Sequence, residues 1–457
     1  MSTDCSGLEG GDGTEVASSR FRVDVVPTSW SRRLGTFLPS MTEALFGEMA
    51  PRWPPYAARV VDLRSGRCVF EPEGFGDTSD WAEALQADLH RMSVDEFCEQ
   101  WSIDREGIGL PPHPARPPAR QADPLNEEQL ATAASERLLR FVGDGVVGMV
   151  VGMVSEDREV IVSRGPVSRD GVFDVGSITK LFTALLLAEM VSQGEVGLDD
   201  PLERFLPAGV RAPRWQGRDI TLVDLATHTS GLPRLPRNLL VRATLHRSDP
   251  YRGYTVPKLQ RGLVATRLRR APGADYRYSN FGFAVLGHAL ASAAGATYEE
   301  LVIDRVCRPL GLGETMFEIK TDAASCRETG HAGAGQPVPD WDPAAFAPAG
   351  GLRSTVADMV RFLRANLDPG RTNLAVALEE VQRPRRSIGA HEDVGLGWHF
   401  RKEGVSTIAW QNGGTGGFGG FVAMLREHGA GVAVLYNSPP SPAVDAAGFG
   451  LLCDMLG

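Results

Sequence analysis

The segment Gly176-Ser177-Ile178-Thr179-Lys180 places a hydroxyl three residues before an amine. Apolar periodicity begins at Ile178, which predicts Ser177 at or near a helix N-terminus and Lys180 one turn later on the same face. A serine hydroxyl is a weak nucleophile until a base removes its proton, and a buried amine with a lowered pKa can be that base. The spacing therefore indicates a nucleophile and its general base. Taken alone, it also fits a capping serine beside a surface lysine.

The rarity of lysine supports the chemical interpretation. Of 47 lysines and arginines only four are lysines, at positions 180, 258, 320 and 402. An amine can lose its proton, whereas a guanidinium effectively cannot. A chain so biased towards arginine is expected to keep lysine where arginine cannot do the work.

A second segment, Tyr278-Ser279-Asn280, stands directly before an apolar helix. A tyrosine hydroxyl facing Ser177 can pass its proton to a leaving group, and Asn280 can orient Lys180 and a substrate carbonyl. Taken alone, the tyrosine also fits a half-buried core residue and the asparagine a helix cap.

The glycine-rich run Trp410–Phe421, WQNGGTGGFGGF, contains the pattern G-x-G-x-x-G from Gly414 to Gly419. A dinucleotide-binding fingerprint follows a strand, opens a helix and has an acidic residue about 20 positions further on. Here a second strand pattern follows, and neither that acid nor a Lys-Ser or Lys-Thr pair is present, which argues against nucleotide binding. Glycines between antiparallel strands more often mark a bulge or a place where a ligand lies close to the backbone.

These three elements, in this order, resemble the serine β-lactamase and penicillin-recognising hydrolase superfamily. The resemblance is strongest to its class C-like branch, which includes D-Ala-D-Ala carboxypeptidases, D-aminopeptidases, family VIII esterases and transacylases. Three further segments are similar to segments of that branch: ITLVDLATHTSGLP (Ile220–Pro233), RPLGLGETMF and APAGGLRSTVADMVRFL. The resemblance covers about residues 127–457 and leaves residues 1–125 outside.

The resemblance implies a role for each matching residue. Ser177 is the acylated nucleophile, Lys180 its general base and Tyr278 the acid and base shared by acylation and deacylation. Asn280 orients the substrate and Lys180. The N–H groups of Ser177 and Gly414 form the oxyanion hole, and the resemblance implies no cofactor or metal.

The third motif departs from the family pattern. Relatives typically have K-T-G, H-x-G or, in some esterases, W-x-G where this chain has Gln411-Asn412-Gly413, which the resemblance places at the substrate. Glutamine cannot carry a positive charge, whereas a lysine at that place would help to hold a substrate carboxylate and would favour the tyrosine anion. We therefore expect that β-lactams and D-Ala-D-Ala termini, which carry an obligatory carboxylate, are not the main substrates.

A Pro-rich stretch divides the chain into two parts. We expect a disordered tail at residues 1–19, a small acidic α+β module at 20–110, a linker at 111–125 and a β-lactamase-like serine hydrolase domain at 126–457. Residues 1–125 contain 20 acidic and 12 basic residues and no chemical motif. The module is expected to dock a protein partner or the catalytic domain, or simply to pack.

Strand patterns at both ends of the hydrolase domain enclose a helix-rich middle. VVGMVVGMVSEDREVIVSRG predicts a hairpin, and STIAWQN, GFVAMLRE and GVAVLYNS predict three further strands near the C-terminus. Helices are predicted between about Ser177 and Leu367 and at the C-terminus. This order predicts an α+β fold with one antiparallel sheet flanked by helices and an inserted helical subdomain.

Bulk properties narrow the class of function. A net charge of −10 makes nucleic acid an unsuitable partner. The N-terminus lacks the basic start and apolar core of a signal peptide, and the longest apolar run contains Glu189, so we expect a cytoplasmic protein without a membrane span. The six scattered cysteines indicate free thiols, and the nine histidines lack the spacing of metal ligands.

We therefore expect a serine hydrolase or acyltransferase that acts on an ester or amide of a small molecule or peptide through an acyl-Ser177 intermediate. Water as acceptor gives an esterase, amidase or peptidase, and an amine or alcohol gives a transacylase. The Arg-rich segment Arg234–Thr255 is expected to meet an anionic ligand or the acidic module, or to be a solvated helix. The alternative is a catalytically weakened binding or regulatory protein, with Gln411 marking lost chemistry.

Overall fold

The computed structural model describes three N-terminal strands by their backbone and residues 125–456 except 156–157, 240–248, 319–325, 334, 390 and 404–405. The chain divides into two compact units, Met1–Gln121 and Ala122–Gly457, which are described separately. The dividing point falls inside the expected linker. The expected tail at 1–19, the helices of the 20–110 module and the linker itself lie outside the described residues, so these boundaries stay predictions.

The first unit contains a three-stranded antiparallel sheet of order β1-β2-β3. Its strands are β1 (Phe21–Pro27), β2 (Tyr56–Asp62) and β3 (Cys68–Phe70). They coincide with the segments FRVDVVP and AARVVDLRSGRCVF, whose composition predicted strands.

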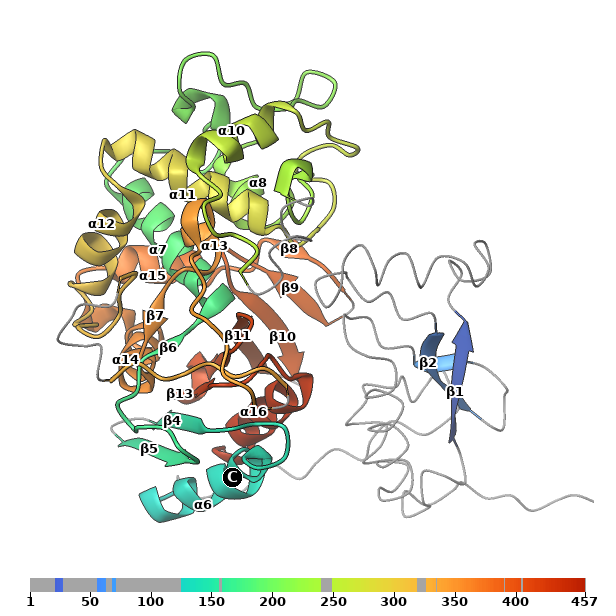
Figure 1. Cartoon of the computed structure of the whole chain (residues 1–457), viewed down its shortest axis with the longest axis vertical. Helices are drawn as coiled ribbons and strands as arrows, with labels where there is room; N and C mark the ends of the chain where they lie inside the picture. The colour runs from blue at the N-terminus through green and yellow to red at the C-terminus, as the bar shows by residue number, and fades with distance from the viewer. Residues whose placement is uncertain are drawn as a thin grey trace, which may run out of the picture. The chain divides into compact units, whose positions relative to one another are not determined.

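The second unit is built on an eight-stranded antiparallel sheet (Figure 1). Its order is β5-β4-β13-β12-β11-β10-β9-β8, so the hairpin that opens the unit pairs directly with the last strand of the chain. The strands are β4 (Met149–Ser155), β5 (Arg158–Arg164), β8 (Arg386–Ser387), β9 (Glu392–Val394), β10 (His399–Glu403), β11 (Ser406–Gly414), β12 (Gly419–Leu425) and β13 (Ala430–Tyr436).

Helices cover both faces of this sheet, which makes β4, β12 and β13 buried along their whole length. One face packs against α6 (Glu127–Arg137) and α16 (Pro442–Asp454), and the other against α14 (Val356–Leu367). Successive residues of a strand point to opposite faces. Accordingly, Met149, Val151 and Met153 of β4 belong to one apolar cluster, and Val150 and Val154 belong to the other.

The chain between β5 and β8 forms the inserted helix-rich subdomain. It contains α7 (Thr179–Ser192), α8 (Leu222–Ala226), α10 (Val256–Val264), α11 (Asn280–Ala294), α12 (Tyr298–Val302), α13 (Ala347–Gly350), α15 (Ala375–Val381) and the short paired strands β6 (Phe173–Asp174) and β7 (Arg353–Ser354), in addition to α14. The predicted α+β architecture, an antiparallel sheet flanked by helices with a helical insertion, is confirmed.

Helix α7 lies at the centre of the unit and carries Lys180, and the turn that contains Ser177 leads directly into it. All of its residues from Thr179 to Met190 are buried. A helix that is apolar on every side must be surrounded by other elements. The polar side chain of Lys180, in the first turn, is therefore removed from water together with its apolar neighbours. No helix among the described residues is long and apolar enough to cross a membrane.

The contact between β4 and α14 depends on Gly152. A Cβ atom at this position would lie 2.5 Å from a methyl carbon of Val356 and 2.5 Å from one of Val360. Gly152→Ala is expected to destabilise the fold by about 1–3 kcal/mol, the usual cost of overpacking. Gly313→Ala is the control, because nothing lies within 4 Å of its Cβ position. Urea unfolding of both variants tests this, and equal stabilities would contradict the described packing.

Candidate active site

The turn that carries Ser177 packs against the glycine end of β11. Ser177 lies in a short helical turn, Gly176–Ile178, between β6 and α7. A Cβ on Gly176 would lie 2.3 Å from Gly414 N, and one on Gly413 would lie 2.1 Å from the carbonyl oxygen of Val175. Only glycine permits backbones to approach this closely. This contact brings the backbone of Ser177 and Gly414 together, and both residues line the same pocket.

The amine of Lys180 is hydrogen-bonded to the serine. Lys180 Nζ lies 2.8 Å from Ser177 Oγ and 2.6 Å from the carbonyl oxygen of Ala349. Burial lowers the pKa of Lys180 well below its ordinary value of 10.5, and the positive charge of Arg234 lowers it further. No carboxylate in the described part of the chain forms an ion pair with it. The lowered pKa favours the neutral amine, whose lone pair can accept the Ser177 proton.

The tyrosine predicted to act as a proton shuttle also meets the serine. The Tyr278 hydroxyl donates a hydrogen bond to Ser177 Oγ at 2.7 Å. Burial raises the pKa of Tyr278, although the bond to Ser177 and the charge of Arg234 oppose this rise. The hydroxyl therefore holds its proton in the resting site. His228 packs against the ring at a centroid distance of 4.4 Å, and its Nδ1 accepts the Ser279 N–H at 3.0 Å, which fixes the segment before α11.

Asn280 is the first residue of α11 and lines the pocket beside Ser177. Its side chain lies close enough to Tyr251 to oppose the burial that raises the pKa of that hydroxyl, and its Oδ1 is buried without a partner. Asn280 was also expected to orient Lys180, but no hydrogen bond joins the two side chains. The Lys180 amine is hydrogen-bonded to the carbonyl oxygen of Ala349 instead.

The residues of the third motif lie behind the pocket and do not line it. Gln411 is buried, and its Nε2 donates to the carbonyl of Gly397 at 3.2 Å. A Cβ on Gly397 would lie 3.0 Å from the carbonyl oxygen of Lys180, so Gln411 supports the turn that packs against α7. Asn412 points to the opposite face of β11, where its Nδ2 donates to Asp445 Oδ2 at 2.7 Å. The predicted contact of these side chains with substrate is therefore not seen in the geometry.

The pocket in front of Ser177 has an aromatic wall. Tyr251 stacks on Phe346 at 4.7 Å between ring centroids and meets Trp341 edge-on at 5.6 Å. The lining residues are Asp174, Ser177, Tyr251, Asn280, Trp341, Pro343, Phe346, Ala349, Gly350, Gly351, Arg353, Gly414 and Thr415. Such a wall suits an apolar or planar acyl group.

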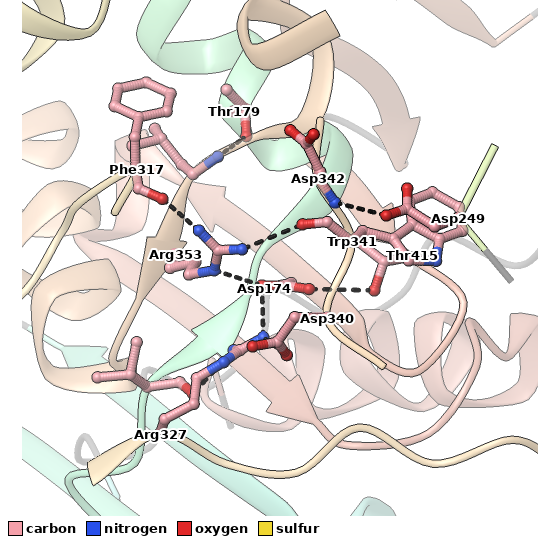
Figure 2. A network of polar contacts seen from close by, with 12 residues as sticks. Asp174, Thr179, Asp249, Phe317, Arg327, Asp340, Trp341, Asp342, Arg353 and Thr415 are labelled. Atoms are coloured by element: carbon pink, nitrogen blue, oxygen red, sulfur yellow. Dashed lines mark hydrogen bonds and ion pairs between the residues drawn. The ribbon is translucent and has the colours of Figure 1, made fainter. Parts of the chain in front are cut away.

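A buried ionic network, which the sequence reasoning missed, holds the other wall together (Figure 2). Asp174 Oδ1 accepts from Arg327 Nη2 at 2.9 Å and from Arg353 Nε at 3.1 Å, and its Oδ2 accepts from the Thr415 hydroxyl at 3.5 Å. Arg353 also donates to the carbonyls of Phe317 and Trp341. The network joins β6, β7 and the loop after Gly414. Its only sequence signal was an aspartate inside an apolar strand, three residues before Ser177.

Metal chemistry finds no support in the side-chain arrangement. Within the described ranges, no group of three or more His, Cys, Asp or Glu side chains lies close enough to hold a metal ion. His228 and His399 are both buried, and burial lowers the pKa of each, to about 4 for His399.

Comparisons with known proteins agree with this geometry. A family model described as Beta-lactamase matches residues 116–452. The chain is 32% identical over 349 residues to the D-alanyl-D-alanine-carboxypeptidase/endopeptidase AmpH of Escherichia coli (strain K12), covering 70% of this chain and 87% of that protein. It is 27% identical over 320 residues to a Beta-lactamase of Pseudomonas fluorescens (62% and 85% covered). It is also 29% identical over 238 residues to Penicillin-binding protein 4 of Amycolatopsis lactamdurans (50% and 60% covered).

Removal of the Asp174 charge tests the ionic network. Asp174→Asn leaves the buried guanidinium of Arg353 without a carboxylate and Arg327 with Asp340 alone, which is expected to cost about 3–5 kcal/mol of folding free energy. Asp340→Asn is the matched control, because Asp340 is 53% exposed and pairs with Arg327 alone. Its loss is expected to cost about 1 kcal/mol or less. Urea unfolding compares the two variants, and similar losses would show that Asp174 is not the centre of the network.

Proposed function

The chain belongs to the beta-lactamase family, and from that premise we propose that it is a serine hydrolase that cleaves a peptide-like amide or ester through an acyl-Ser177 intermediate. The observation that carries this proposal is the pair of hydrogen bonds at Ser177 Oγ: one joins it to Lys180 Nζ at 2.8 Å, and the Tyr278 hydroxyl donates the other at 2.7 Å. One neighbour is a neutral base and the other a protonated acid.

In acylation, the neutral Lys180 amine takes the Ser177 proton while Oγ attacks the acyl carbon. The backbone N–H groups of Ser177 and Gly414 stabilise the negative charge that develops on the carbonyl oxygen. Tyr278 gives its proton to the departing nitrogen or oxygen, and the C–N or C–O bond breaks. The proton on Lys180 then returns to Tyr278, which restores both residues and leaves the acyl group on Ser177.

In deacylation, a water molecule attacks the acyl carbon and its proton passes to Tyr278 or Lys180. The bond to Ser177 Oγ breaks, Oγ recovers a proton from the same pair, and the acid product leaves. We propose water as the acceptor because the names of the relatives include carboxypeptidase, endopeptidase and beta-lactamase. Transfer to an amine or alcohol would use the same residues.

Two unpartnered buried atoms support a peptide-like substrate. Asn280 Oδ1 can only accept a hydrogen bond and Trp341 Nε1 can only donate one, and neither has a partner among the described residues. Both residues line the pocket. A buried polar group left unpaired costs about 1–3 kcal/mol, which a ligand that pairs with it recovers. A backbone-like amide carries both complementary groups, one N–H and one C=O.

Covalent labelling tests the proposed nucleophile. The wild-type protein is expected to gain the mass of one phosphonyl group from a fluorophosphonate probe, because the neutral Lys180 activates the Ser177 hydroxyl. Ser177→Ala should gain none, whereas Ser279→Ala, which changes the neighbouring helix cap, should still be labelled. Intact mass spectrometry is the measurement. Absence of both adduct and ester turnover in the wild type would instead favour a binding protein.

The pH dependence of kcat/KM tests the state of Lys180. The neutral amine is the active form, and its pKa lies well below 10.5. Hydrolysis of an uncharged ester should therefore be fully active at neutral pH and be lost as the pH falls through the lowered pKa. Lys180→Met should reduce kcat by about 10²- to 10⁴-fold, the usual contribution of a general base. Activity that increases only near pH 10 would show that the pKa of the Lys180 amine is not lowered.

A further inference from the structure

We propose that the guanidinium of Arg234 binds a carboxylate of the substrate at the mouth of the Ser177 pocket, on the leaving-group side of the scissile bond. This inference rests on the proposed function, since it identifies which acyl compounds the Ser177 site accepts. It makes substrates with a free carboxylate close to the scissile bond the preferred class.

The backbone at Arg234 is fixed by the first turn of α11. The Ser279 hydroxyl donates to the carbonyl of Pro233 at 2.7 Å, and the Phe281 N–H donates to the carbonyl of Arg234 at 3.1 Å. The same turn presents Tyr278 to Ser177. The guanidinium carbon of Arg234 lies 5.0 Å from the centroid of the Tyr278 ring, within the range of a cation–π contact. The cation is thus held beside the residue that protonates the leaving group.

The guanidinium of Arg234 is not neutralised by a carboxylate of the described chain. Arg234 is exposed, and among the described residues its guanidinium forms neither an ion pair nor a hydrogen bond. Most other arginines of the unit are paired with carboxylates, and Arg353 at the pocket is bonded to Asp174 and to two carbonyl groups. Arg234 is therefore available to a ligand, whereas Arg353 is not.

The charge of Arg234 acts on several buried groups around the site. It lowers the pKa of Lys180 and opposes the burial that raises the pKa of Tyr278, Tyr251 and Tyr276. One carboxylate, that of Glu392, also acts on Tyr276, and no described carboxylate acts on the other three groups. His228, which also faces this cluster, has a pKa lowered well below its ordinary value by burial and so is neutral. Beside Lys180 and Tyr278 the positive charge is consequently that of Arg234.

The chemistry of the leaving group matches this position. When the C-terminal residue of a peptide is cleaved off, its carboxylate carbon is two bonds from the scissile nitrogen. A guanidinium binds a carboxylate with two parallel hydrogen bonds. Gln411 is buried and uncharged, so it cannot supply this interaction. The expectation that substrates with an obligatory carboxylate are not the main ones rested chiefly on that position, and in this proposal Arg234 supplies the charge from another element.

Two esters with the same acyl group test the proposal: 3-(hippuryloxy)benzoate, whose leaving group carries a carboxylate, and 3-(hippuryloxy)benzamide, whose leaving group does not. The wild-type enzyme should hydrolyse the benzoate with the higher kcat/KM. Arg234→Gln should reduce kcat/KM for the benzoate about 10-fold or more relative to the benzamide, as expected for loss of a charged hydrogen bond. Arg234→Lys should retain part of the preference.

Arg237→Gln is the matched control, because this exposed arginine is three residues away and does not act on Lys180 or Tyr278. It should leave the preference unchanged. Equal hydrolysis of the two esters by the wild type, or an equal loss for both in Arg234→Gln, overturns the carboxylate site and leaves the proposed function intact. If the wild type hydrolyses neither ester and forms no acyl-Ser177 adduct, the proposed function fails and this inference fails with it.

Discussion

The buried amine of Lys180 has no counter-ion in the described part of the chain, and its hydrogen bonds run to Ser177 Oγ and to the Ala349 carbonyl. A charged ammonium in this position would lose its hydration without compensation, at a cost of several kcal/mol. Burial without a counter-ion therefore favours the neutral amine, and a neutral amine beside a serine hydroxyl can act as a base beside a nucleophile. The apolar surroundings of α7 are the physical source of this chemistry, because they exclude the water that would otherwise stabilise the charge.

A second requirement is that the sheet edge and the nucleophile turn lie in direct backbone contact. Gly176 and Gly413 permit that contact, which brings the backbone of Ser177 close to that of Gly414. The loop after Gly414 is tied by Thr415 to Asp174, and Asp174 is held by two guanidiniums. The backbone around Ser177 and Gly414, which we propose as the oxyanion site, is thus held by glycine contacts on one side and by a buried ionic network on the other.

Much of this site could be predicted from sequence because distinctive side chains occur at short spacing. A serine and a rare lysine one helical turn apart, and a tyrosine before an apolar helix, specify both chemistry and placement. The Ala349 carbonyl could not be predicted, since every residue carries one. Asp174 and Arg353 are 179 positions apart, and only the pairing of β6 with β7 brings them together. The alternation of side chains along a strand does separate Gln411 from Asn412, so both could not face α7.

The protonation state of Lys180 decides whether this amine can act as a base, and the scarcity of lysine makes that state directly measurable. The chain has four lysines, so ¹³Cε-labelled lysine gives four resonances that Lys→Arg substitution at positions 258, 320 and 402 assigns. Titration of these resonances reports the pKa of each amine. The Lys180 resonance is expected to be that of a neutral amine already at pH 7, because burial lowers the pKa of this amine well below its ordinary value. A Lys180 resonance that titrates near the ordinary lysine pKa of about 10.4 would contradict a neutral resting amine.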